Sequence, residues 1–291
     1  MQHSLFLTVS LLWGVNFLLM KIAVTAYTPI GVAAIRVFSG AIFLTLIVIY
    51  RERQWPFRRI HIPGLAVIVL MGYAWPFVVQ PYLIQFCGSG MIGLMPSYIT
   101  TITIMISIPM LGVRPTPRQL TGVVAGLGFI SLLFIDGLHR DVDLLHLAAA
   151  ITVPLSYAIS NTYVKRAFSK VSPVMLTFFC LAVTSIILTP YAIVETLQAN
   201  YDNVSVILPT ISAVALGVFG TGIALLCFTI MLQKRGPLFA GMVTYVIPVI
   251  ALLMGALDGE HVSALQITAL SGILAMVAIV QWPSQQSLQH T

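Results

Sequence analysis

Long runs of apolar residues, separated by short polar stretches, make up almost the whole chain. Most runs are about 20 residues long, which is the length a helix needs to cross the ~30 Å hydrocarbon core of a bilayer. Ten such segments are present, and each is predicted to be a transmembrane helix: roughly 4–24, 29–50, 62–86, 89–111, 117–135, 146–168, 172–195, 208–233, 236–257 and 263–282. The pattern leaves no segment for a soluble domain.

The composition agrees with this pattern. Of the 291 residues, 59% are hydrophobic and only 8% are charged, whereas a soluble domain has about 25% charged residues. A soluble enzyme and a nucleic-acid-binding protein are therefore excluded. The three cysteines, Cys87, Cys180 and Cys227, lie in apolar runs without paired spacing and are expected to be free thiols. The predicted fold class is an all-α integral membrane protein with ten transmembrane helices.

The basic residues predict the orientation in the membrane, because cytoplasmic loops are enriched in Lys and Arg. If the N-terminus is cytoplasmic, Arg140 is the one basic residue in an outer loop, and Lys21 and Arg36 fall within spans. The other eleven lie at the inner side: Arg51, Arg53, Arg58, Arg59, Arg114, Arg118, Lys165, Arg166, Lys170, Lys234 and Arg235. Both termini are then cytoplasmic, and the net charge of +6 is a topology signal that needs no nucleic-acid partner.

The second half of the chain repeats the first. Trp13, Asn16, Lys21 and Pro29 are matched 144 residues later by Tyr157, Ser160, Lys165 and Pro173. Further along, at an offset of 146, Gly90 matches Gly236, Arg114 matches Glu260 and Gly126 matches Gly272. We therefore divide the chain into two five-helix repeats, residues 1–144 and 145–291 with a short polar tail. An odd number of helices per repeat requires the second repeat to be inverted in the membrane.

Inverted repeats are typical of secondary transporters, whose sites lie near the bilayer midplane and use spans interrupted by Gly or Pro. The third span contains Gly72, Pro76 and Pro81, and its mate, the eighth, contains three glycines. Packing kinks are the simpler interpretation, since Gly and Pro are common in membrane helices. The matching positions favour a functional break in both spans.

The residues Trp13-Gly14-x-Asn16-Phe17-x-x-x-Lys21, followed by Pro29 and Arg36, resemble the opening of the EamA family in the drug/metabolite transporter superfamily. The short loop with Glu260 before a Gly272-centred helix is also similar to that family. The resemblance covers both repeats. It implies a ten-helix transporter in a bacterial inner membrane with both termini cytoplasmic, usually exporting amino acids or other small metabolites, and in some relatives quaternary amines or drugs.

Two positions depart from the family pattern. Arg114 stands where the first repeat of the family usually has Glu, and Cys180 stands where a second Arg36 would be expected. The resemblance does not fix the substrate, and these departures do not identify it.

Several polar and aromatic residues lie deep in the predicted spans. Trp13, Asn16 and Phe17 share one helical face by the i, i+3, i+4 rule, and their mates in the sixth span share the equivalent face. We predict that these two faces meet around one cavity, lined from spans 1, 3, 4, 6, 8 and 9. Helix–helix hydrogen bonding is the alternative, at about 0.6–2 kcal/mol for each bond.

Arg36 lies seven residues beyond Pro29 and has no carboxylate near it in the middle of a span. An arginine at the centre of a membrane helix costs about 2.5–3.5 kcal/mol on insertion scales. Its side chain has three possible roles: binding a substrate carboxylate, bonding backbone carbonyls beside a broken helix, or extending to the interface. Lys21 lies nearer the outer end of its span, where extension to the interface is the expected role.

Deep acids and histidines are missing from the predicted spans. Proton relays in transporters usually use such residues, so we expect facilitated diffusion or exchange without obligatory proton coupling. No metal motif or deep carboxylate pair suggests an enzyme, and no cofactor is expected. Phosphate-rich substrates are disfavoured because one deep arginine poorly balances several charges.

These observations lead to one main hypothesis: an inner-membrane exporter of small metabolites, with amino acids or related zwitterions as substrates, working by alternating access. The expected partners are a small-molecule substrate and the lipid bilayer, with the protein a monomer or a homodimer. A transporter of quaternary amines or lipophilic cations is the main alternative, and a non-transport scaffold or sensor is a distant one. The candidate substrate-binding residues are Trp13, Asn16, Phe17, Arg36, Trp75, Tyr98, Tyr157, Asn161, Phe219, Thr221, Phe228 and Tyr245.

Overall fold

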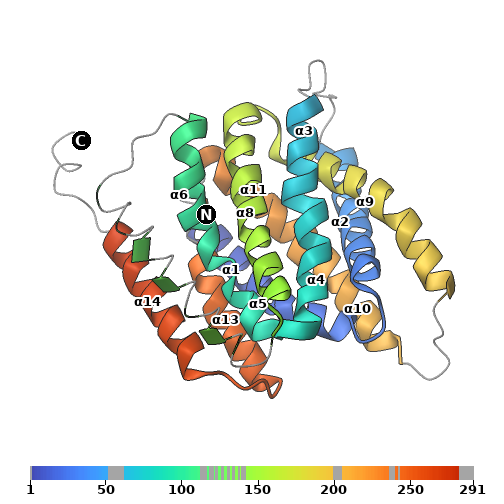
Figure 1. The fold of residues 1–291 in the computed structure, drawn as a ribbon. Helices are drawn as coiled ribbons and strands as arrows, with labels where there is room; N and C mark the ends of the chain where they lie inside the picture. Colours follow the sequence, from blue (N-terminus) through green and yellow to red (C-terminus); the bar gives the residue numbers. More distant parts are fainter. Residues whose placement is uncertain are drawn as a thin grey trace.

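The computed structural model describes residues 2–51, 62–111, 142–198, 205–235 and 240–281 except Met242, together with scattered residues between 117 and 138. All regular structure in these ranges is helical, without any strand (Figure 1). In the first half the helices are α1 (Gln2–Ala23), α2 (Pro29–Arg51), α3 (Ile62–Ile68), η1 (Val69–Ala74), α4 (Trp75–Cys87), α5 (Ser89–Leu94) and α6 (Ser97–Leu111). In the second half they are α8 (Leu144–Ala167), α9 (Pro173–Gln198), α10 (Ile207–Ala215), η2 (Leu216–Ile223), α11 (Ala224–Arg235), α13 (Val243–Leu257) and α14 (Ala264–Gln281).

Six helical segments of the described chain are long and apolar enough to cross a bilayer: Leu5–Ala23, Pro29–Tyr50, Ile62–Cys87, Leu144–Ala167, Pro173–Glu195 and Ile207–Lys234. The predicted fourth span is divided at Met95 and Pro96 into α5 and α6. The predicted ninth span corresponds to α13, a shorter apolar helix. Most of the predicted fifth span, 117–135, lies outside the described residues. The predicted tenth span, 263–282, corresponds to α14 (Ala264–Gln281). The structure is therefore that of a multi-pass membrane protein.

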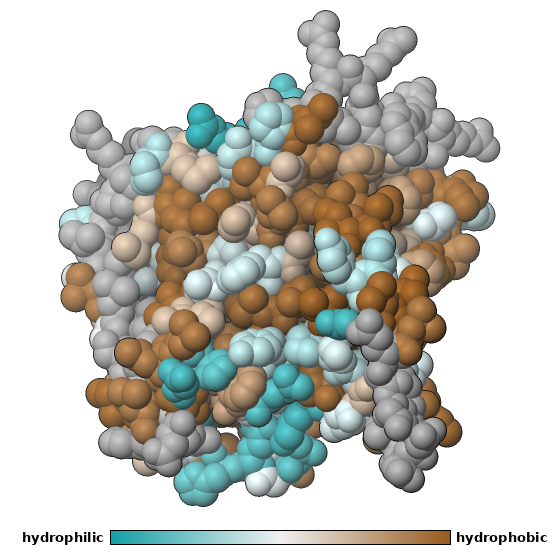
Figure 2. All heavy atoms as spheres, turned by 45° about the vertical axis from the view of Figure 1, so that its right-hand side comes forward, coloured by the Kyte–Doolittle hydropathy of each residue, from teal (hydrophilic) through white to brown (hydrophobic). Residues whose placement is uncertain are grey.

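The outer surface is the kind that faces lipid. Large apolar side chains such as Tyr50, Leu197 and Ile49 are 89%, 81% and 76% exposed, and water-soluble proteins rarely expose wide apolar areas. Figure 2 shows that the middle of one face is mostly apolar, while hydrophilic side chains gather toward its lower end. A bilayer would cover the apolar middle of this face.

The third and eighth spans contain π-helical turns at matching places, η1 and η2. Pro76 explains the first, because proline has no N–H for the carbonyl of Gly72 and its ring clashes with that carbonyl. In η2, the Thr221 hydroxyl donates to the carbonyl of Leu216 five residues earlier, at 3.0 Å. Short π-helical segments inside α-helices are frequent at functional sites. Both spans are therefore interrupted, as predicted, and the interruption is a short π-helical segment within the helix.

Close helix packing holds the two halves together next to the site. In the described chain α1 packs against α13, α2 against α9, and α5 against α13. The approach of α5 to α13 depends on Gly93, since a Cβ placed there would lie 2.3 Å from the Cβ of Ala251. Gly93 allows two helices from different halves to touch through their backbones, as small residues do in membrane proteins.

Replacing Gly93 with alanine is predicted to lower the stability of the protein in detergent, because overpacking of a close contact costs about 1–3 kcal/mol. The midpoint of thermal unfolding, followed by size-exclusion chromatography, measures the effect. Gly128→Ala is the matched control, since no atom lies within 4 Å of a Cβ built at that glycine. Equal midpoints for the two variants would contradict the packing account.

Candidate functional site

A narrow cavity, of about 80 Å³, lies between the two halves of the chain. This volume is below the range of about 300–1,000 Å³ that is usual for small-molecule sites. The lining comes from the six predicted spans and also from α2. The lining residues are Trp13, Asn16, Phe17, Met20, Arg36, Ile68, Gly72, Tyr73, Phe77, Gln80, Pro96, Ile99, Tyr157, Ser160, Asn161, Val164, Gly220, Leu225, Phe228, Thr229, Leu232, Thr244 and Ile247.

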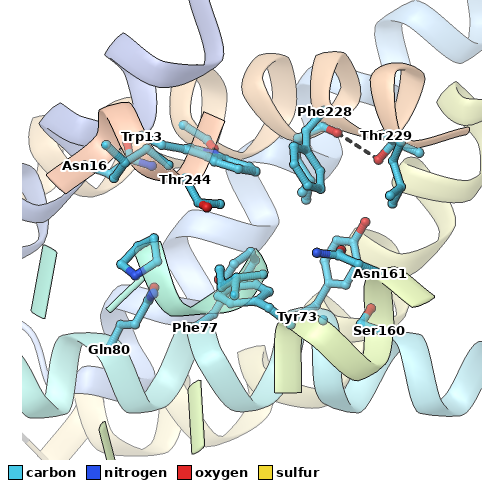
Figure 3. Close-up of a pocket in the computed structure, with 18 of the residues that line it drawn as sticks. Trp13, Asn16, Tyr73, Phe77, Gln80, Ser160, Asn161, Phe228, Thr229 and Thr244 are labelled. Atoms are coloured by element: carbon cyan, nitrogen blue, oxygen red, sulfur yellow. Dashed lines mark hydrogen bonds between the residues drawn. The ribbon is translucent and has the colours of Figure 1, made fainter. Parts of the chain in front are cut away.

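Figure 3 shows how the polar side chains enter the cavity from several helices. Trp13, Asn16 and Thr244 lie on one side, and Gln80, Phe77 and Tyr73 lie on the facing side. The rings of Trp13 and Phe228 are tilted against each other with centroids 4.9 Å apart. The cavity thus has aromatic walls with separate amide and hydroxyl groups between them, a combination typical of sites that orient a small ligand.

Arg36 supplies the one formal charge in the cavity lining. Its side chain is buried; Nε donates to the hydroxyl of Thr221 at 2.6 Å, and Nη1 lies 3.7 Å from the sulfur of Met20. The guanidinium carbon stands 4.0 Å from the centre of the Phe77 ring, a cation–π arrangement. No carboxylate of the described chain forms an ion pair with it. The guanidinium is held in place, and its charge has no acidic partner.

Thr221 connects this charge to the π-helix. Its hydroxyl accepts a hydrogen bond from Arg36 and donates one to the carbonyl of Leu216. Because both hydrogen-bonding functions of the hydroxyl are used inside the protein, Thr221 orients Arg36 and has no hydroxyl proton left for a ligand. The irregular backbone of η2 therefore fixes the direction of the guanidinium.

The same π-helix also holds α1. Trp13 Nε1 donates to the carbonyl of Gly220 at 2.8 Å. A Cβ at Gly220 would lie 2.1 Å from Oδ1 of Asn16. In the other half, a Cβ at Gly72 in η1 would lie 2.3 Å from Oγ of Ser160. Asn16 and Ser160 are repeat mates, so each repeat packs the same polar face of its first helix against a glycine in the π-helix of the other repeat.

Seven of the twelve candidate residues line the cavity: Trp13, Asn16, Phe17, Arg36, Tyr157, Asn161 and Phe228. They come from α1, α2, α8 and α11. The two helical faces that the sequence pairs do open onto one space, while the roles of these residues toward a substrate remain a prediction.

Two expected wall residues lie elsewhere. Trp75 is 46% exposed and donates to the hydroxyl of Thr152 at 2.9 Å, and Phe219 is 51% exposed beside an apolar surface depression. The sequence pattern did not assign these two side chains to a helical face. Trp75 is two residues from both Tyr73 and Phe77, so it points away from the side on which they line the cavity, and Gly220 faces the cavity in place of Phe219.

Three further candidates are buried outside the lining: Tyr98, Thr221 and Tyr245. Thr221 acts on Arg36, as described above. The Tyr98 hydroxyl has no hydrogen-bond partner in the described chain, although the side chain is 1% exposed. An unpartnered buried hydroxyl destabilises a protein by about 1–3 kcal/mol, so the Tyr98 hydroxyl lowers the stability of this conformation.

Several polar lining residues were not among the sequence candidates: Tyr73, Gln80, Ser160, Thr229 and Thr244. Gln80 carries the clearest missed signal, since it is an amide between Pro76 and Pro81 deep in an interrupted span. Its spacing of three and seven residues from Phe77 and Tyr73 places all three on one helical face.

The described residues contain no group of three or more His, Cys, Asp or Glu that could hold a metal ion. Among the described residues, no Asp, Glu or His lines the cavity. Asp136, expected at the end of a span, is buried at 2% exposure but lies outside the lining. The arrangement is suited to binding and releasing a small molecule.

Comparisons with known proteins agree with this architecture. The model of the EamA-like transporter family matches residues 2–135 and again residues 144–282. The chain is 25% identical over 265 residues to the uncharacterized transporter YoaV of Bacillus subtilis, covering 87% of this chain and 86% of YoaV. It is 23% identical over 276 residues to the uncharacterized inner membrane transporter YedA of Escherichia coli, covering 93% and 87%. A crystal structure superposes with a TM-score of 0.71 at 20% identity, over 96% of both chains, which shows the fold.

Tyr98 and Trp13 form a matched pair for a test of these contacts. Tyr98→Phe removes a hydroxyl without a partner and is predicted to keep or raise the thermal unfolding midpoint in detergent. Trp13→Phe removes the indole N–H that donates to the Gly220 carbonyl. Loss of this hydrogen bond lowers the free energy of unfolding by about 1–3 kcal/mol, so the thermal unfolding midpoint falls. A loss of stability in Tyr98→Phe as large as in Trp13→Phe would show that the tyrosine hydroxyl is satisfied.

Proposed function

The chain belongs to the EamA-like transporter family, and we propose that it exports small metabolites, namely amino acids or related zwitterions, across a bacterial inner membrane. Relatives named as transporters support membrane transport. The proposed mechanism is alternating access of the central cavity between two inverted five-helix repeats, with both termini in the cytoplasm.

The buried charge of Arg36 carries this proposal. A guanidinium in a low-dielectric cavity without an acid is stabilised by an anionic ligand, and its planar donors match a carboxylate. Asn16, Gln80 and Asn161 add amide groups that can accept from an ammonium or donate to a carboxylate. The aromatic walls supply surface for an apolar side chain. A small carboxylate-bearing metabolite therefore uses every part of the cavity.

The aromatic pair of Trp13 and Phe228 favours a second candidate, a quaternary amine or lipophilic cation bound through cation–π attraction. Arg36 opposes this candidate, because its positive charge lines the same cavity. The two candidates therefore differ in how transport responds to the loss of that charge.

The cavity lining also bears on energy coupling. Transporters that move protons usually use Asp, Glu or His along the path, and none of these is among the described residues of the lining. We propose facilitated diffusion or exchange without obligatory proton coupling, so an imposed pH gradient should leave the rate of substrate exchange unchanged. Accumulation driven by a pH gradient would contradict this part of the proposal.

Arg36→Gln is predicted to lower kcat/KM for exchange of amino acids in proteoliposomes at least about tenfold, because the amide cannot neutralise a carboxylate. Uptake of radiolabelled amino acids and choline-like cations into vesicles loaded with unlabelled substrate measures this effect. Cation uptake that survives the substitution would favour the second candidate. Absence of saturable flux for either class in the wild type would contradict both.

Thr221→Val is predicted to raise KM for the same substrate several-fold with a smaller effect on kcat, because Arg36 loses the acceptor that orients it. Thr221→Ser retains the hydroxyl and should recover most of the affinity. Equal KM values for the valine and serine variants would show that the hydroxyl does not position Arg36.

A further inference from the structure

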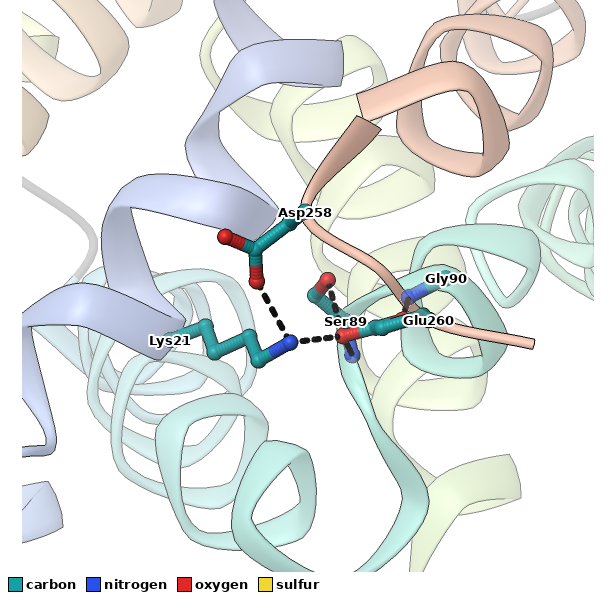
Figure 4. Close-up of polar contacts among 5 residues, drawn as sticks. All are labelled: Lys21, Ser89, Gly90, Asp258 and Glu260. Carbon is teal, nitrogen blue, oxygen red and sulfur yellow. Dashed lines mark hydrogen bonds and ion pairs between the residues drawn. The ribbon is translucent and has the colours of Figure 1, made fainter. Parts of the chain in front are cut away.

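A cluster of charges lies where α1, α5 and the turn between α13 and α14 meet (Figure 4). Lys21 Nζ lies 2.5 Å from Oδ2 of Asp258 and 2.8 Å from Oε1 of Glu260. Glu260 also accepts hydrogen bonds from the backbone N–H and hydroxyl of Ser89, at 3.0 and 2.7 Å, and from the N–H of Gly90 at 2.8 Å. Lys21 thus forms specific ion pairs, where the sequence suggests a side chain that only extends to the interface.

The backbone around the carboxylate of Glu260 is built of glycines. A Cβ would lie 2.9 Å from Oε2 at Gly255 and 3.1 Å from it at Gly90. Gly88 and Gly259 have φ of 78° and 81°, values that side-chain-bearing residues rarely adopt. The chain approaches Glu260 from both halves only because these positions lack side chains.

The contacts of Glu260 favour its charged form. Burial alone would raise its pKa, but the hydrogen bonds from Lys21, Gly90 and Ser89 lower the pKa to about 2. A carboxyl group whose pKa is lowered on folding stabilises the folded state at pH values above its unfolded pKa of about 4.3. This contribution is lost as the pH falls toward 2. Lys21 is the charged side chain in contact with Glu260, and Lys21 also forms an ion pair with Asp258. These contacts are therefore complete throughout the range from pH 5 to 8.

The cluster adjoins the lining of the cavity. Met20, next to Lys21 in the chain, lines the cavity and touches Arg36. Lys21 and Ser89 belong to the first half of the chain, and the 258–260 turn belongs to the second half. A substrate that left through this end would have to pass between elements that these contacts join.

The opposite end has a different arrangement. Lys165, the repeat mate of Lys21, donates to the backbone carbonyl of Gln233 at 3.1 Å. The side chain of Gln233 donates to the carbonyls of Phe168 and Val171, both at 3.0 Å. All four residues belong to the second half, so these bonds do not join the two halves. In the sequence, the mate of Glu260 is Arg114, which lies outside the described residues and has the same charge sign as Lys165.

We propose that Lys21, Asp258, Glu260 and the backbone N–H groups of Ser89 and Gly90 form an ionic latch at one mouth of the cavity, with no acidic counterpart among the described residues at the other mouth. The latch biases the substrate-free protein toward the conformation closed at this mouth, the periplasmic one in the predicted topology. This inference rests on the alternating access proposed above, but it concerns the resting equilibrium and is tested without a substrate.

A cysteine reporter at Gln80, which lines the cavity, measures the opening of the mouth. The Gln80→Cys protein carries Cys87→Ala and Cys227→Ala and keeps Cys180, a thiol with 0% exposure. A membrane-impermeant maleimide is added to spheroplasts, which expose the periplasmic face, and to inside-out vesicles. Glu260→Gln is expected to raise the rate of reporter labelling from the latch side at least about tenfold, with Cys180 still unlabelled.

Two variants serve as matched controls. Lys21→Arg keeps the charge and should retain the slow labelling, whereas Lys165→Met removes the equivalent lysine at the other end and should not raise labelling from the latch side. The proposal is overturned if Glu260→Gln leaves reporter labelling unchanged, or if Lys165→Met accelerates it equally. The proposal would also be overturned if Cys180 became labelled together with the reporter cysteine, because the cluster would then stabilise the whole fold and would not control the opening of the mouth. The labelling rates are measured without substrate, so an error in the proposed substrate class would not change them.

Discussion

The buried charge of Arg36 is the constraint on which the rest of the site depends. A cation within a membrane span costs several kcal/mol unless water or polar partners surround it. Here one hydroxyl, one sulfur and one aromatic ring face the guanidinium, and no carboxylate of the described chain pairs with it. These neutral partners hold the side chain in place but leave its charge uncompensated. This uncompensated charge is the basis of the proposal that the ligand carries an anionic group.

The π-helices make this arrangement possible. Backbone groups inside a membrane must find partners within the protein, and a change of register releases carbonyls from the usual pattern. Trp13 donates to the Gly220 carbonyl, and Thr221 links the Leu216 carbonyl to Arg36. The irregular backbone is thus tied to both α1 and α2. Because η2 contacts the charge and the first helix together, a movement of this span would change the cavity and its charged group at the same time.

Much of the fold and of the cavity could be predicted from the sequence. The interrupted spans, the cavity-facing pair of Trp13 and Tyr157 and the deep position of Arg36 follow from hydropathy, repeats and helical periodicity. The orientation of Trp75 and Phe219 was not predicted, because the position of a residue along a span does not show which side of the helix faces the cavity. The partners of Lys21 were missed for another reason: Asp258 and Glu260 are more than 230 residues away in the chain, and only the tertiary fold brings them together.

The central claim is that the cavity recognises a carboxylate through Arg36. Equilibrium binding of an amino acid and of its carboxamide, to the wild type and to Arg36→Gln, tests it most directly, because the two ligands differ only in that group. The account predicts that the wild type prefers the amino acid at least about tenfold, a difference of about 1.4 kcal/mol, and that the variant loses this preference. Equal affinity of the wild type for both ligands, or an undiminished preference in the variant, would contradict the claim.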